Sequence, residues 1–330
     1  LGIYSWHGMP KKKYQKRYIS SDWPSIEPMI KDFIAHAPNE IKKPNFGCLG
    51  VAGRVINNFS SLTNLNWELY STKIASSTNL KKIELINDFT ALIYALPFLQ
   101  TNQHTDIQNG AQKIRLDGVV AVIGAGTGLG IARGFLTKNS ILALPSEGGH
   151  TEFAPRSKEE WLFSEWLKNE LNLVRLSIER VISGTGLGYI AKWMIIKSNL
   201  DHPLKTKAEI WPNHSEERID FPSLASQAAK DGDILMNQAV QFWLSAYGSA
   251  AGDLALSELC YSGLWIAGGA TIKNLEGIKS EVFLDSLREK GRFKDVMRNF
   301  PIRAITDPQA GLYGAACKAH LLAESNEKLI

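Results

Sequence analysis

Glycine occupies every second position from Gly124 to Gly130, in the run Gly-Ala-Gly-Thr-Gly-Leu-Gly. The apolar run Val119 to Ile123 precedes it, and a second strand-like segment follows it. The spacing differs from that of a dinucleotide-binding fingerprint, because position 129 is Leu and position 131 is Ile, and no Lys-Ser/Thr ending marks a P-loop. The run predicts a β-hairpin whose bare backbone amides can bind a phosphate. A hairpin turn without a ligand is the alternative.

An Asn-Asp pair lies where a short apolar strand gives way to a helix. Asn87 and Asp88 follow Ile83 to Ile86 and precede the Ala- and Leu-rich stretch Phe89 to Leu96. Both residue types are preferred helix N-caps, but a cap needs only one of them. The carboxyl end of a strand is also where α/β proteins place groups that face a ligand. Capping and ligand binding both stay open for this pair.

Three further polar or glycine-rich segments also allow both a structural and a ligand-binding interpretation. They are Glu147-Gly148-Gly149-His150, Glu179 ahead of Ser183-Gly184-Thr185-Gly186, and Ile266-Ala267-Gly268-Gly269. Plain turns explain the glycine pairs, and a solvated or Arg-paired side chain explains Glu179. Alternatively, glycines let the backbone approach a ligand closely, such as a flat purine or a ribose.

Together and in this order, the segments resemble the hallmarks of the bacterial glucokinase family, within the hexokinase, actin and heat-shock ATPase superfamily. The matching stretches are Ile-Asn-Asp-Phe (86–89), Gly-Ala-Gly-Thr-Gly-Leu-Gly (124–130), Glu-Gly-Gly-His (147–150), Glu-Arg-Val-x-Ser-Gly (179–184) and Ile-Ala-Gly-Gly (266–269). The resemblance extends from Leu1 to about His320. It implies an α/β fold of two actin-like (ribonuclease H-like) ATPase domains with a ligand cleft between them. Residues 1–98 plus 309–330 would form the small α/β domain, and residues 99–308 the large one.

The resemblance also implies an activity, the ATP-dependent phosphorylation of the 6-hydroxyl of glucose, with Mg²⁺ as the accompanying ion. It assigns Asp88 as the general base that accepts the hydroxyl proton. Other residues are assigned to the sugar (Asn87, Glu147, His150 and Glu179), to the phosphates (Gly124, Gly126, Thr127 and Gly128) and to the adenosine (Gly268 and Gly269). The stretch Leu62 to Trp67 resembles the family's Thr-Asn-x-x-Trp loop beside the sugar. No residue is assigned as a metal ligand.

One family feature is not found in the printed chain. The family has a first phosphate loop, Asp-x-Gly-Gly-Thr, directly before the strand that matches Leu1 to Ser5. We therefore expect a fragment of a complete enzyme, with an unpaired strand edge beside residues 1–5. The alternative is a catalytically inactive sugar-binding or regulatory protein of the same fold. An actin-like structural ATPase is disfavoured, because it has no use for Glu147, His150 and Glu179 around a neutral polyol.

Composition limits the class of protein. A length of 330 residues allows two domains, and 44% hydrophobic with 21% charged residues is typical of a soluble globular chain. The formal charge of +4 is small, and the only basic run, Lys11 to Lys13 with Lys16 and Arg17, is interpreted as a solvated hairpin edge. We therefore expect no nucleic acid and no membrane as partners. The resemblance implies glucose as the partner, and a homodimer is a possible assembly. Cys48, Cys260 and Cys317 are far apart in no metal-binding spacing, which favours a reducing cytoplasm and argues against structural zinc.

Local patterns predict several elements. A strand at Leu1 to Trp6 and another at Tyr14 to Ile19 are expected on either side of the basic turn, followed by a helix from about Ser25 and a buried strand at Phe46 to Ala52. Further expected elements are a surface connection (100–116), a helix (159–171), a long loop or insertion (198–222), a long helical region (224–256) and a C-terminal helix that begins near Ala310. The resemblance implies that this last helix folds back onto the first domain.

Overall fold

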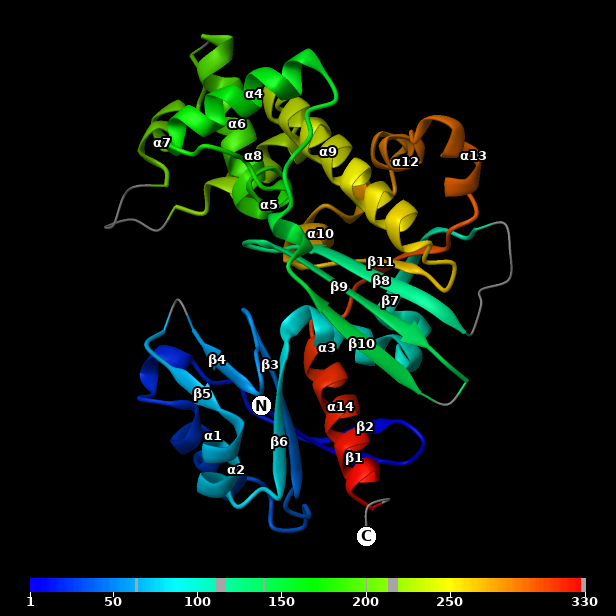
Figure 1. Ribbon diagram of the computed structural model, residues 1–330. Helices are drawn as coiled ribbons and strands as arrows, with labels where there is room; N and C mark the ends of the chain where they lie inside the picture. Colours follow the sequence, from blue (N-terminus) through cyan, green and yellow to red (C-terminus); the bar gives the residue numbers. More distant parts are fainter. Residues whose placement is uncertain (63–64, 111–116, 139, 200, 213–218, 328–330) are drawn as a thin grey trace. The chain divides into compact units, whose positions relative to one another are not determined.

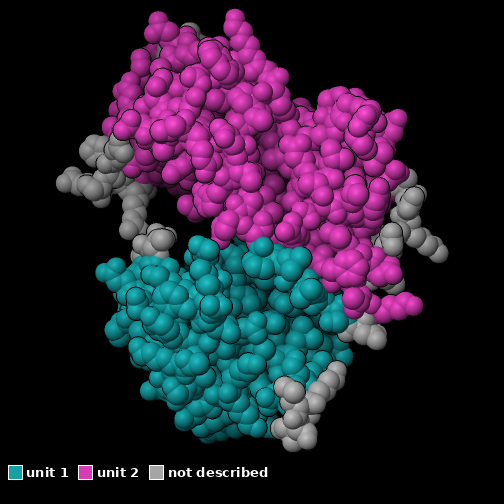
Figure 2. Space-filling view, in the orientation of Figure 1, with its two compact units in different colours: residues 1–104, 139–145, 307–330 teal, residues 105–138, 146–306 magenta. Residues whose placement is uncertain are grey.

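The computed structural model describes residues 1–62, 65–110, 117–138, 140–199, 201–212 and 219–327, which form two compact units (Figure 2). Unit 1 comprises Leu1–His104, Asn139–Pro145 and Asp307–Ile330, and unit 2 comprises Thr105–Lys138 and Ser146–Thr306. The sequence places the boundaries at 98 and 308 instead, and gives 139–145 to the large domain. Residues 99–104 join unit 1 because Gln103 and Asp307 are hydrogen bonded through both backbone and side chains.

Unit 1 consists of short strands and helices (Figure 1). Its strands are β1 (Gly2–Trp6), β2 (Pro10–Gln15), β3 (Phe46–Val51), β4 (Phe59–Ser61), β5 (Glu68–Tyr70) and β6 (Lys82–Asn87). Its helices are α1 (Ile26–Ala35), α2 (Ser71–Thr78), α3 (Asp88–Ala95) and α14 (Ala310–Glu327).

The main strands of unit 1 form two separate pairs. β1 is antiparallel to β2, and β3 is parallel to β6, whereas β4 and β5 form a small antiparallel pair of their own. Helix α14 packs against α3 and also against all four strands of the two main pairs. On α1, Ile26 and Met29 belong to an apolar cluster with Val51 of β3 and Leu85 of β6. The predicted C-terminal helix and its packing on the first domain are confirmed.

Unit 2 contains the larger core. A six-stranded sheet has the order β10-β9-β8-β11-β12-β7, with bounds β7 (His104–Gln108), β8 (Gly118–Ala125), β9 (Leu129–Leu136), β10 (Ile141–Ser146), β11 (Leu264–Ala267) and β12 (Ile302–Ile305). Most of this sheet belongs to unit 2, whereas residues 141–145 of β10 are assigned to unit 1. The helices of unit 2 are α4 (Lys158–Glu170), α5 (Ile178–Ile182), α6 (Gly184–Ser198), α7 (Lys205–Ile210), α8 (Phe221–Lys230), α9 (Ile234–Glu258), α10 (Gly269–Lys273), α11 (Leu275–Ile278), α12 (Glu281–Arg288) and α13 (Lys294–Met297).

Strand β8 is the centre of unit 2. It is apolar and buried from Val120 to Ala125, which suits a strand with neighbours on both edges and helices over its face. Helix α9 packs against it, and the fully buried Trp243 and Tyr247 of α9 belong to the same core. None of the described helices is long and apolar enough to span a membrane.

Four local predictions are wrong. The second strand runs over Pro10–Gln15, so the three exposed lysines lie within the strand rather than in the turn. The polar segment 100–116 contains β7, which lies at the edge of its sheet, where polar side chains are tolerated. The expected loop 198–222 contains α7. The long helical region is two helices, because Gly232 adopts a positive φ of 95° between α8 and α9.

Candidate active site

The alternating glycines of unit 2 form the predicted hairpin. Strands β8 and β9 pair in antiparallel register, with Gly124 opposite Gly130 and Ala125 opposite Leu129. Residues 126–128 make the turn, and the amide of Gly126 donates to the carbonyl of Gly128 at 2.8 Å. A Cβ on Gly126 would meet no atom within 4 Å, so this side of the turn is open. The turn therefore offers uncovered backbone at the end of a buried strand.

The amino end of α6 is attached to this turn. The amide of Gly184 donates to the carbonyl of Gly126 at 2.8 Å, and the hydroxyl of Thr185 donates to the carbonyl of Thr127 at 3.0 Å. Ser183 caps the helix, since its hydroxyl accepts from the amide of Gly186 at 3.0 Å. The first turn of a helix carries partial positive charge from its unpaired amides. Turn and helix together therefore provide an environment that favours an anion.

A second glycine turn ends the neighbouring parallel strand. In the register of β8 and β11, Ala267 is opposite Gly124, and Gly268 follows with a positive φ of 96°. A Cβ on Gly268 would overlap the carbonyl oxygen of Ala125, so only glycine fits there, whereas Gly269 has open space around its Cα. Both glycine turns thus lie at the carboxyl ends of adjacent parallel strands, the edge where α/β sheets bind ligands.

Two carboxylates and an imidazole converge beside the hairpin. His150 Nε2 lies 3.8 Å from Glu147 Oε2, and His150 Nδ1 lies 3.9 Å from Glu179 Oε1. The other oxygen of Glu179, Oε2, accepts from the amide of Leu129 at 3.0 Å. The side chains of Glu147 and His150 are more than half exposed, and that of Glu179 is 26% exposed. The structure therefore brings together three of the four predicted sugar residues, with acceptors and donors accessible to solvent.

The backbone around His150 is held by its own contacts. Gly149 is buried, and a Cβ there would overlap the carbonyl oxygen of Leu129. The amide of Gly148 donates to the hydroxyl of Ser146 at 3.0 Å, and the guanidinium of Arg175 donates to the carbonyl of His150 at 3.1 Å. Close packing against β9 therefore requires glycine at position 149, and it fixes the backbone that carries the imidazole of His150.

In unit 1, the structure shows which residue of the Asn-Asp pair caps the helix; the sequence had left both capping and ligand binding open for the pair. The side-chain oxygen of Asn87 accepts from the amides of Phe89 and Thr90, at 2.9 and 3.2 Å, so Asn87 is the N-cap of α3. Asp88 is the first residue of that helix; its Oδ1 accepts from the amide of Phe89 at 2.9 Å, and it is half-buried. Capping therefore does not require the carboxylate of Asp88.

Several residues that support the site had no predicted role. Ser183 and Thr185 lie in the noted Ser-Gly-Thr-Gly segment, which was the available signal. The hydroxyl of Tyr247 accepts from the amide of Ala125 and donates to the carbonyl of Ile123, each at 3.3 Å. No sequence pattern indicated this contact with the hairpin, because the two segments are more than a hundred residues apart in the chain. The burial of Tyr247 raises the pKa of its phenol. Thr63 and Asn64 of the predicted sugar loop lie outside the described residues.

Comparison with known proteins decides the family. The sequence model of the Glucokinase family matches residues 1–322. The chain belongs to the glucokinase family. A glucokinase of Trichormus variabilis is 38% identical over 317 residues, which are 93% of this chain and 91% of that protein, and one of Salmonella heidelberg is 32% identical over 307 residues, covering 93% and 88%. The predicted family and its glucokinase activity are therefore confirmed.

Solved structures agree. The crystal structure of a glucokinase from an Antarctic psychrotroph superimposes with a TM-score of 0.78 at 27% identity, covering 95% of this chain and 91% of that one. A glucokinase of the ROK family from Streptomyces griseus, in complex with glucose and AMPPNP, has a TM-score of 0.57 at 20% identity over 90% of this chain and 88% of that one, and so supports the fold alone. The predicted actin-like α/β fold is confirmed.

Proposed function

We propose that this chain transfers the γ-phosphoryl group of ATP to the 6-hydroxyl of glucose. The observation that carries the proposal is the cluster of Glu147, His150 and Glu179 directly beside the glycine turn at residues 126–128. A polyol needs several donors and acceptors at short range, and phosphates need backbone amides and positive dipoles. Unit 2 supplies both kinds of group within one loop cluster.

The sugar side of the proposal uses Glu147, His150, Glu179 and Asn87. Carboxylates accept from sugar hydroxyls, and the imidazole can donate to or accept from them. Glu179 also links the sugar side to the hairpin, because its second oxygen holds the amide of Leu129. An analogue lacking one hydroxyl would leave one of these groups unpaired, which is the physical basis of discrimination among hexoses.

The nucleotide side uses the two glycine turns. We assign the phosphates to Gly124, Gly126, Thr127 and Gly128, near the amino end of α6, and the adenosine to the open face of Gly268 and Gly269. In the described residues no three His, Cys, Asp or Glu side chains are grouped closely enough to bind a metal. Mg²⁺ would therefore keep most of its water and accompany the phosphates, without a cluster of protein ligands around it. When bound, it would neutralise phosphate charge.

Asp88 is proposed as the general base. It follows a strand end and is half-buried, and the helix that it begins is capped by Asn87. A carboxylate within hydrogen-bond reach of the 6-hydroxyl would take the proton as the oxygen attacks phosphorus.

We further propose that the protein acts in the cytoplasm and that it assembles as a homodimer. The alternative function is that of a sugar-binding protein that has lost catalysis.

The substitution Asp88→Asn tests the proposal. In the protein we expect glucose to bind as before while turnover falls by about 10² to 10⁴, the usual effect of a lost general base. Asp295→Asn is the matched control, since Asp295 is also an aspartate in the first turn of a helix, and it should leave turnover unchanged. A loss of less than about threefold for Asp88→Asn would show that this carboxylate is structural.

A further inference from the structure

A buried tyrosine of α9 links the two strands that lead into the glycine turns of unit 2. The hydroxyl of Tyr247 accepts from the amide of Ala125, the last residue of β8, at 3.3 Å. It also lies 3.1 Å from the hydroxyl oxygen of Thr271, and Thr271 donates to the carbonyl of Ala267, the last residue of β11, at 2.6 Å. Three hydrogen bonds in series therefore join the end of β8 to the end of β11.

The two hydroxyl protons give this chain of hydrogen bonds its direction. Because the proton of Thr271 is directed at Ala267, the Thr271 oxygen accepts from the phenol of Tyr247. The phenol proton has a second acceptor in the carbonyl of Ile123, at 3.3 Å. Both side chains are fully buried, and burial raises the pKa of the phenol, so the phenol keeps its proton. No solvent molecule can reach either hydroxyl to replace it.

The chain lies where the pairing of the two strands ends. In the parallel register of β8 and β11, the last pair is Gly124 with Ala267. After that pair, β8 leads into the turn at residues 126–128, and β11 leads into the turn at Gly268 and Gly269. The ladder register therefore no longer sets the separation of the two turns. The hydroxyls of Tyr247 and Thr271 connect the strands at this point.

One helical turn earlier on α9, Trp243 contacts the third element of the nucleotide side. Its indole nitrogen donates to the carbonyl of Ser183, the N-cap of α6, at 3.1 Å, and also contacts the carbonyl of Ile182. Trp243 and Tyr247 are four residues apart, and their ring centroids are 5.3 Å apart. One face of α9 therefore contacts the strand of each turn and the amino end of α6.

We propose that Tyr247 and Thr271 are positioning residues that set the separation between the phosphate turn (126–128) and the adenosine turn (Gly268 and Gly269). This role rests on the proposed function, in which the nucleotide uses both turns. A ligand that occupies two sites at once binds best when their separation matches its own length. The affinity for ADP or ATP therefore depends on the link, whereas a molecule that occupies one turn does not sense it.

The experiment removes each hydroxyl and keeps most of the side-chain volume. In Tyr247→Phe and in Thr271→Val, we expect the dissociation constant of ADP to rise by about three- to tenfold, the effect of one lost buried hydrogen bond. Adenosine and inorganic pyrophosphate each occupy one turn, so their dissociation constants should stay within about twofold, as should that of glucose. The double variant should resemble either single variant, since each breaks the same chain.

Binding is measured by calorimetry with Mg²⁺ present, and adenosine and pyrophosphate are followed by their displacement of ADP. This readout does not depend on turnover, so a loss of catalysis leaves it intact. Thr271→Ser restores a hydroxyl and should return the dissociation constant of ADP to within about twofold of the original value. Denaturant titration of every variant shows how much stability each one loses.

Thr78→Val is the matched control. Thr78 is also a buried helical threonine that donates to the carbonyl four residues earlier, that of Ile74, at 2.7 Å, but it lies in α2 of unit 1. It should lower the free energy of unfolding about as much as Thr271→Val does, without changing the affinity for ADP. Thr78→Val thus separates a loss of stability from a change in the spacing of the turns.

Three outcomes would contradict the proposal. If Tyr247→Phe and Thr271→Val lost stability but kept their affinity for ADP, the two hydroxyls would be structural only. An equal loss of affinity for ADP, adenosine and pyrophosphate would indicate damage within the turns rather than a changed separation. If adenosine and pyrophosphate failed to displace ADP from the unaltered protein, the assignment of the two turns to the nucleotide would be wrong, and the positioning role would be wrong with it.

Discussion

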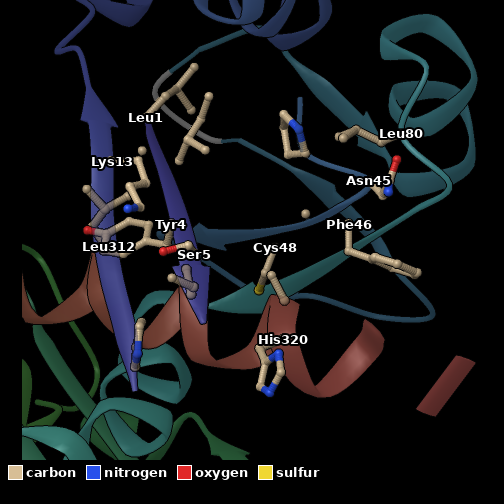
Figure 3. Close-up of a pocket in the computed structure, with 18 of the residues that line it drawn as sticks. Leu1, Tyr4, Ser5, Lys13, Asn45, Phe46, Cys48, Leu80, Leu312 and His320 are labelled. Carbon is tan, nitrogen blue, oxygen red and sulfur yellow. The ribbon is translucent and has the colours of Figure 1, made fainter. Parts of the chain in front are cut away.

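The hairpin of unit 2 and the strand pairs of unit 1 differ in how completely their backbones are paired. Strand β8 has a partner on each edge, and its turn is bonded to α6 and Glu179. Among the residues that the structure describes, strands β1 and β3 each have one partner, and both border a cavity (Figure 3). The comparison indicates that the phosphate and sugar groups of unit 2 are held by a strand paired on both edges, whereas among the described residues Asn87 and Asp88 follow β6, whose only strand partner is β3.

Hydrogen exchange gives the largest expected contrast between the two regions. Amides of β8 are buried and paired on both sides, so they should exchange only through large-scale opening, at least about a thousandfold more slowly than the outward amides of β1 and β3. The measurement is amide exchange followed by mass spectrometry of peptides from each strand. Similar amide exchange rates in β8 and β3 would contradict the proposed difference in backbone pairing between the two units.

Glycine-to-alanine substitutions compare how tightly the backbone is packed in the two regions. Gly149→Ala places a methyl group onto the carbonyl of Leu129 and should lower the free energy of unfolding by about 1 to 3 kcal/mol, with weaker glucose binding. Gly50→Ala, on β3, meets only ordinary contacts with Ala91 and Asp88 and should change that free energy by less than about 1 kcal/mol. Denaturant titration of both variants provides the test, and a larger loss for Gly50→Ala would reverse the comparison.

Glu179 tests whether the sugar residues also support the hairpin. Glu179→Gln keeps an acceptor for the amide of Leu129 but removes the charge next to His150. It should raise the KM for glucose by roughly ten- to a hundredfold, as expected for a hydrogen bond of about 1.5 to 3 kcal/mol to a charged group. The KM for ATP should change little. Glu179→Ala removes the acceptor as well and should raise both values, so identical behaviour of the two variants would contradict the dual role.

Thr185 gives the smallest expected effect. Thr185→Val removes the hydroxyl that donates to the carbonyl of Thr127, worth about 0.5 to 1.5 kcal/mol, and should raise the KM for ATP by a few fold without affecting glucose. Thr151→Val is a matched control, since Thr151 also donates to a backbone carbonyl, that of Gly148, on the sugar side. It should alter the glucose KM alone.

The sequence predicted the parts of the site that depend on local chemistry. Alternating glycines next to an apolar run indicated the hairpin, and Asn87-Asp88 after a strand indicated a strand-to-helix junction. It could not show which of the two residues is the cap, because that depends on where the Asn87 oxygen points. It also could not show the contact of Tyr247 with the hairpin, which joins segments far apart in the chain.

The wrong predictions for residues 46–52 and for β7 have one cause, since a local sequence pattern does not report which strands lie beside a segment. Residues 46–52 were expected to be buried, yet β3 is half-buried over most of its length, because one of its edges borders a cavity rather than a strand. The polar β7 was missed because an edge strand does not need an apolar pattern.

The most direct test of the account is the reaction itself. The full-length protein, incubated with ATP, Mg²⁺ and glucose, should release ADP only when glucose is present, and form glucose 6-phosphate in equal amount. Glucose binding should be measured on the same sample by calorimetry. Tight glucose binding without glucose-dependent ADP release would contradict the proposed kinase and favour the sugar-binding alternative.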